Sequence, residues 1–145
     1  MRISKYFTYD ELTISETAER KGIQNVPDDE CLANLTLLAE RLDQVRELLG
    51  HAIIITSGFR SIQVNKWVGG AKTSQHVKGQ AADLICPRFG SPYEVCKALI
   101  DSGIEFDQLI LEYGRWTHFS VSPNPRRQVL SIYSGTGYMG GLQHN

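Results

Sequence analysis

The sequence predicts an α+β fold in which helices pack on an antiparallel sheet. Three observations support this prediction. The first is a long amphipathic helical pattern, and the second is a series of short β-branched or apolar runs after it. The third is that the last of these runs are joined by turn-like segments, with no helical pattern between them. The chain of 145 residues, 41% of them hydrophobic, can bury roughly 70% of its unfolded surface. We therefore expect residues 1–145 to form one domain, including an N-terminal segment at 1–27 and a flexible tail at 134–145.

The N-terminal half is expected to be mostly helical. The Thr8-Tyr-Asp-Glu11 segment has capping-box spacing and predicts a short helix that ends near Thr13. Residues 15–27 are polar, and we expect them to be irregular. Apolar residues recur at three- and four-residue steps over residues 28–49, which predicts one long helix with a single buried stripe. Gly50 follows, where a helix end favours a residue with positive φ.

The middle of the chain alternates between strands and helices. Residues 52–57 are β-branched and apolar, so we predict a strand that is buried on both faces. A short helix is expected at 62–67 and a second strand at 81–85. The Ser91-Pro-Tyr-Glu94 segment combines a capping box with proline at the first helical position, which predicts a helix over 92–102.

The C-terminal part is expected to complete the sheet. Residues 108–112 and 116–121 surround Tyr113-Gly114-Arg115 and are typical of a hairpin. Residues 128–133 predict a last strand. The glycine-rich residues beyond it are expected to be a mobile tail.

Composition argues against several classes of function. The net charge of −1 and the lack of a basic run argue against nucleic-acid binding. A membrane span needs about 20 consecutive apolar residues, and no stretch of the sequence approaches this length. Residues 1–7 do not resemble a signal peptide. We therefore expect synthesis in the cytoplasm and no membrane partner. Three scattered cysteines indicate reduced thiols. The oligomeric state does not follow from the sequence.

A metal site is the strongest chemical signal in the chain. His76 and Asp83 lie seven positions apart with Gly79 between them, and His118 follows on a later predicted strand. Alternate side chains of a strand share one face, so Asp83 and His118 can lie together on neighbouring strands while His76 approaches from a loop. Two imidazoles and one carboxylate suit zinc and leave a fourth position for water, as in catalytic sites. Manganese and iron accept similar ligands.

Other residues are weaker candidates for metal binding. Cys86 follows the strand that carries Asp83, but a complete ligand set exists without it. His51 follows a predicted helix end and suits a capping role, and we assign no role to His144. In a further interpretation the histidines only form hydrogen bonds and no metal binds.

The arrangement of these residues resembles a family of zinc peptidases. The motifs are Ser74-x-His76-x-x-Gly79-x-Ala81-x-Asp83, Trp116-x-His118, Ser57-Gly-Phe-Arg60-Ser61 and Val68-Gly-Gly-Ala71. Together they resemble the zinc D-alanyl-D-alanine carboxypeptidases and the L-alanyl-D-glutamate endopeptidases of phage lysins, particularly the short phage and prophage branch. The resemblance extends from about residue 7 to about residue 121. It implies a hedgehog-like α+β fold.

The resemblance also implies roles for the site residues. His76, Asp83 and His118 would be the zinc ligands. Arg60 would lie near the metal and stabilise negative charge on the substrate carbonyl oxygen or bind a substrate carboxylate. Ser74 would form a hydrogen bond at the edge of the site, where it would contact substrate without binding the metal.

The position of the general base departs from the pattern of the family. Many relatives have an acidic residue three positions before the last histidine ligand, whereas this chain has Arg115 there. Glu112 is the nearest carboxylate and our candidate for the base, with Asp107 as the second choice. Trp116 is expected either to line the substrate cleft or to pack in the core.

Two functions remain open at this point. The first is a zinc metallopeptidase that hydrolyses an amide bond in bacterial peptidoglycan stem peptides, as a carboxypeptidase or an endopeptidase. With no signal peptide expected, such an enzyme would act on the cell wall as a phage or prophage endolysin after release, or as part of a phage particle. The alternative is a non-catalytic zinc-binding structural or cell-wall-binding module, such as a phage tail component. The displaced acidic position favours this alternative.

Overall fold

The structure is a computed structural model that describes residues 1–145. It is an α+β fold with five helices and six strands, as predicted. In chain order they are α1 (Tyr9–Thr13), α2 (Glu16–Lys21), α3 (Asp29–Leu49), β1 (Ile54–Ser57), α4 (Ile62–Trp67), β2 (Ala81–Ile85), α5 (Pro92–Asp101), β3 (Gln108–Glu112), β4 (Trp116–Ser120), β5 (Gln128–Tyr133) and β6 (Gly137–Gly140).

The sheet is mostly antiparallel, with the strand order β1-β2-β4-β3-β5-β6. The exception is the pair β3 and β5, which run parallel. The chain leaves β4 at Ser120, passes the start of β3 through residues 121–127, and begins β5 beside it. The Gln128 amide donates to the Asp107 carbonyl over 2.9 Å at this crossover. The expectation of a purely antiparallel sheet is therefore wrong at this one pair.

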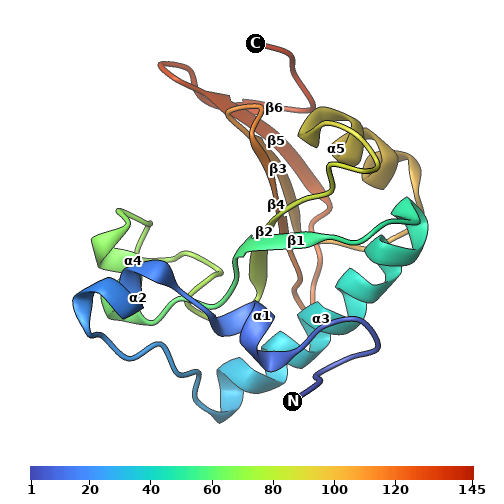
Figure 1. The fold of residues 1–145 in the computed structure, drawn as a ribbon. Coiled ribbons are helices and arrows are strands. Elements are labelled where there is room, and N and C mark those ends of the chain that lie inside the picture. Colours follow the sequence, from blue (N-terminus) through green and yellow to red (C-terminus); the bar gives the residue numbers. More distant parts are fainter.

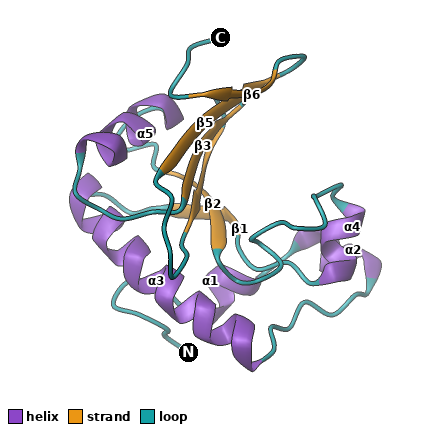
Figure 2. Ribbon diagram, turned by 180° about the vertical axis from the view of Figure 1, so that it is seen from behind, coloured by secondary structure: helices purple, strands orange, loops and turns teal.

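One face of the sheet is covered and the other carries the polar groups. Helices α3 and α5 lie on the same side of the sheet, while α2 and α4 lie on the opposite side near its lower end (Figures 1 and 2). The apolar stripe of α3 contributes the fully buried Leu35, Leu38 and Leu42 to the core beneath the sheet. Because successive strand residues alternate between faces, the side chains that face away from this core are free to form a site.

Local signals place the main helices correctly. The Asp28 side chain accepts from the Cys31 amide at the start of α3, and Gly50 ends that helix with a φ of 69°. Ser91 and Glu94 form the predicted capping box of α5. Each cap satisfies backbone groups that a helix end leaves without partners.

Three predictions about regular structure are wrong. Residues 15–27 are not irregular throughout, since the Ser15 side chain accepts from the Ala18 amide and begins α2. Strand β1 is not buried on both faces, because it is an edge strand and its Ile54 is 51% exposed. The residues after 133 include β6, which pairs with β5 and so is not part of a mobile tail.

All the helices of the structure are too short or too polar to cross a bilayer.

Candidate metal centre

The pairing of β2 with β4 brings two of the predicted ligands together. Asp83 and His118 are direct partners in this antiparallel pair, so their side chains project from the same face. His118 Nδ1 lies 3.2 Å from Asp83 Oδ1. Both residues are buried, with 5% of Asp83 and 8% of His118 exposed.

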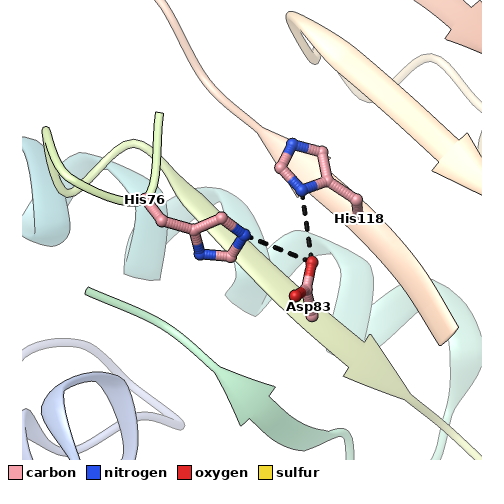
Figure 3. Close-up of side chains that lie close together, drawn as sticks. All are labelled: His76, Asp83 and His118. Carbon is pink, nitrogen blue, oxygen red and sulfur yellow. Dashed lines mark hydrogen bonds and ion pairs between the residues drawn. The ribbon is translucent and has the colours of Figure 1, made fainter. Parts of the chain in front are cut away.

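The third side chain reaches the same point from the loop between α4 and β2. His76 Nε2 lies 3.3 Å from Asp83 Oδ1, and Figure 3 shows both rings turned toward this carboxylate. On its other side, the His76 Nδ1 lies 2.8 Å from the Gly58 carbonyl oxygen. A carbonyl oxygen can only accept, so this contact fixes the proton on Nδ1 and leaves the lone pair of Nε2 toward the cluster.

Gly79 sets the position of this loop against α3. It has a φ of 76°, and a Cβ atom there would lie 2.5 Å from the Cys31 carbonyl oxygen. Its amide donates to the His76 carbonyl over 3.3 Å. A side chain at Gly79 would therefore move the loop that holds His76.

The three side chains fit a metal ion. One donor atom from each of His76, Asp83 and His118 lies within 4.8 Å of the other two. Burial lowers the pKa of His76, which keeps its imidazole neutral and able to bind a cation. Burial acts to raise the pKa of Asp83, but the hydrogen bond from His118 and the adjacent His76 imidazole outweigh it, and the pKa lies below its usual range. Two imidazoles and a carboxylate are a donor set that suits zinc.

The remaining candidate ligands lie elsewhere. The Cys86 thiol is buried and donates to the Ala52 carbonyl over 3.4 Å. His144 stacks on Tyr93 with ring centroids 3.8 Å apart. Neither belongs to the cluster of potential metal donors, and neither does His51.

Arg60 lies beside the cluster as the motif predicts. Its Nη2 is 3.5 Å from Asp83 Oδ2, and its Nε donates to the Ser57 hydroxyl over 3.1 Å. The Asn65 side-chain oxygen accepts from Nη1 over 3.4 Å. These contacts hold the guanidinium group at the edge of the site, where 18% of the side chain is exposed.

Ser74 has a local structural contact. Its hydroxyl oxygen accepts from the His76 amide over 3.2 Å, which stabilises the turn that presents His76. Ser74 also lines the groove described below.

Glu112 lies on the same face of the sheet as the cluster. A tight turn with positive φ at Tyr113 and Gly114 joins β3 to β4, and Glu112 pairs directly with Trp116 across it. The Trp116 indole N–H donates to Glu112 Oε2. Burial, and then the negative charge of Asp83, raise the pKa of the Glu112 carboxyl. A carboxyl group with a raised pKa exchanges protons near neutral pH more readily.

Asp107 is less suited to proton transfer, because its carboxylate is fully engaged. The Arg126 guanidinium contacts both of its oxygens, at 2.9 and 2.7 Å. The Gln75 amide donates to Oδ2 over 2.9 Å. Hydrogen bonds from Arg126 lower the pKa of Asp107 to about 2. This pair joins the start of β3 to the crossover before β5, which is a structural role.

The cluster opens into a long polar groove of about 1010 Å³. Its walls come from the loop between α4 and β2 and from β3, β5, β6 and the crossover. Sequence reasoning points to seven groove residues, namely Arg60, Ser74, His76, Asp83, Asp107, Glu112 and His118. It missed Gln75, Lys78, Arg126 and Tyr138, which also line the groove. Strand pairing and the crossover bring Tyr138 and Arg126 to the groove, while Gln75 and Lys78 lie on the loop that carries His76, at positions where the motif specifies no residue type.

Comparison with known proteins agrees with this arrangement. A model of the family described as Peptidase M15 matches residues 5–120. The chain belongs to the peptidase M15 family. The matched residues include the whole cluster together with Arg60 and Glu112, whereas β5 and β6 lie beyond them.

One curated relative can be described more closely. The chain is 37% identical over 79 residues to a zinc D-Ala-D-Ala carboxypeptidase of Streptomyces albus G. The aligned part is 54% of this chain and 30% of that protein. This chain therefore spans less than a third of the length of that relative.

Proposed function

We propose that this M15 protein is a zinc peptidase that hydrolyses an amide bond in bacterial peptidoglycan stem peptides. The observation that carries the proposal is the buried His-Asp-His cluster at the base of an open groove. The curated relative is named for zinc and for D-Ala-D-Ala, and a stem peptide is the substrate that corresponds to that name. We further propose that residues 1–145 act as one domain with a hedgehog-like arrangement.

In this proposal His76, Asp83 and His118 hold the zinc ion. Bound zinc supplies a Lewis acid that polarises a carbonyl group and lowers the pKa of water. The protein's own contribution is to orient the ligands. The Gly58 carbonyl fixes the tautomer of His76, and Arg60 approaches the outer oxygen of Asp83. Such outer contacts hold ligating groups in place.

Arg60 and Glu112 perform the remaining chemistry in this proposal. Arg60 presents a permanent positive charge at the edge of the cluster, which stabilises negative charge as it develops on the substrate carbonyl oxygen. Glu112 accepts a proton from the attacking water at Oε1, because Oε2 is held by the Trp116 indole. It then returns the proton to the leaving amine. Ser74 contacts the substrate at the groove edge.

The open shape of the groove allows a peptide chain to extend along it. Both removal of a terminal D-alanine and cleavage within the stem, at L-Ala-D-Glu or at a cross-link, are compatible with it. We place the protein with phage or prophage endolysins, made in the cytoplasm and acting on the wall after release or as part of a phage particle. The resemblance of its motifs to the phage and prophage branch of the family supports this placement.

A non-catalytic zinc module, either a wall-binding domain or a phage tail component, is the second candidate. The observation that favours it is the exposed Arg115 at the position where many relatives have an acidic residue. In that case the cluster would stabilise the loop of His76, and the groove would bind a wall peptide without cutting it.

Digestion of purified peptidoglycan separates the two candidates. The zinc-loaded protein is incubated with cell wall, and the products are analysed by mass spectrometry and by counting new amino groups. A peptidase releases products whose masses identify the cut bond, and a chelator stops the release until zinc is restored. One zinc ion per chain with no new amino groups would refute the peptidase and support the module.

A further inference from the structure

The strand β6 adds a residue to the groove that lies outside the part of the chain matched by the family, which ends at residue 120. Glu112 on β3 pairs with Ile132 on β5, and Ile132 pairs with Tyr138 on β6. Directly paired residues project to the same face. Tyr138 therefore lies on the face that carries Glu112 and the metal cluster.

The other residues of β6 do not place a side chain in the groove. Gly137 and Gly140 have no side chain, and Met139 packs against the hydrophobic core on the opposite face. Gly140 is connected to His118 by a line of residues paired across neighbouring strands: His118 pairs with Ile110, Ile110 with Leu130, and Leu130 with Gly140. This end of the sheet thus leaves the groove open beside the cluster and places a single side chain from β6 in its wall.

The Tyr138 side chain is positioned to meet a ligand. It lines the groove together with Glu112, Asp83 and His118, yet it is 62% exposed. Partial burial, followed by the negative charge of Glu112, raises the pKa of the phenol. Its hydroxyl group therefore keeps its proton at neutral pH and remains a hydrogen-bond donor.

We propose that the Tyr138 hydroxyl donates a hydrogen bond to a backbone carbonyl of the peptide that occupies the groove. A peptide offers such acceptors at regular spacing along its length, and the phenol O–H of tyrosine is a hydrogen-bond donor. Tyr138 would then be a peptide-binding contact supplied by β6. This inference rests on the proposed function for the identity of the ligand as a stem peptide.

The test compares Tyr138 on β6 with Tyr113 in the turn between β3 and β4. Tyr138→Phe removes only the hydroxyl group in the groove. Tyr113→Phe is the matched control, since Tyr113 is 44% exposed, packs against Trp116 with the two rings tilted, and does not line the groove. Zinc content and the circular dichroism spectrum are measured for both variants, and neither should change.

Two measurements follow with a synthetic stem pentapeptide. In turnover assays, Tyr138→Phe should raise KM about three- to tenfold, the effect of one lost hydrogen bond, with kcat within about twofold. In calorimetric titrations, zinc-loaded Glu112→Gln protein that also carries Tyr138→Phe should bind the peptide about three- to tenfold more weakly than Glu112→Gln protein alone. Tyr113→Phe should change neither quantity.

The outcomes distinguish this inference from the proposed function. If the wild-type protein cuts no stem peptide, the peptidase proposal fails, while the titration still tests the contact made by Tyr138. An unchanged Kd in the titration would overturn the assignment of Tyr138, and so would a loss confined to kcat. A wild-type protein that cuts the peptide would leave the proposed function standing in either case.

Discussion

Replacing Gly79 by alanine should damage both the fold and the metal centre. Gly79 has a φ of 76°, and an added Cβ atom would lie 2.5 Å from the Cys31 carbonyl oxygen of α3. Two costs follow. The left-handed backbone costs an alanine about 1–2 kcal/mol, and displacement of closely packed backbone costs about 1–3 kcal/mol more. The expected loss of stability is therefore about 2–5 kcal/mol.

The difference in stability between Gly79→Ala and Gly50→Ala isolates the second of these costs, the steric clash. Gly50 has a φ of 69°, but nothing lies within 4 Å of the position of its Cβ atom. Both variants have the backbone cost, and only Gly79→Ala has the steric clash. Since 1 kcal/mol corresponds to about 2–4 °C in a chain of this size, Gly79→Ala should melt at least about 2 °C below Gly50→Ala.

The assay is thermal unfolding followed by circular dichroism, with the zinc-free protein so that metal binding does not add to stability. Zinc affinity is then measured separately by titration. The Gly79 amide donates to the His76 carbonyl, so a shift of this loop should move His76 and weaken zinc binding. Gly50→Ala should bind zinc normally. Equal melting temperatures for the two variants would show that the loop does not pack on α3 as the structure has it.

Three further predictions concern the carboxylates of the groove. Glu112→Gln should lower kcat about 10²–10⁴-fold in a stem-peptide assay while zinc content is unchanged, and Glu105→Gln, outside the groove, should be fully active; an active Glu112→Gln protein would remove Glu112 as the base. Trp116→Phe should lower kcat about three- to tenfold through the lost indole donor, and a double-mutant cycle should show no further loss in Glu112→Gln protein. The pKa of Asp107 is lowered to about 2 from 3.8 by hydrogen bonds from Arg126. The ion pair therefore stabilises the fold above about pH 4 and loses this effect as the pH falls through about 2. Asp107→Asn should be less stable than wild type in denaturant at pH 7, with a difference that narrows toward pH 2; a constant difference would contradict this.

Much of the fold follows from local signals. The capping residues Asp28 and Ser91 and the glycine at position 50 mark helix ends, and the structure has α3 and α5 where these residues place them. The missed helix α2 had a local signal as well, because Ser15 caps it and Gly22 ends it. Local hydrogen bonds and side-chain periodicity act over a few residues, so a single sequence contains them.

The chemistry of the candidate site was also readable from the sequence. The alternation of side chains on strands predicted that Asp83 and His118 could lie together, and the structure has them as direct partners. The register itself was not readable, because it depends on which strands become neighbours. The contacts of the two candidate bases, Asp107 and Glu112, could not be read from the sequence either. Both line the groove, but the Asp107 carboxylate is held by Arg126 of the crossover, whereas Glu112 accepts from the Trp116 indole through Oε2.

The sequence by itself thus determined which residue types could bind a metal and which segments would be helical, because both depend on composition and spacing along the chain. Only the tertiary structure decided that β5 runs parallel to β3, that β6 extends the sheet, and that Tyr138 faces the cluster. The physical reason is that strand pairing joins segments distant in sequence, and its outcome depends on the packing of the whole sheet on α3 and α5.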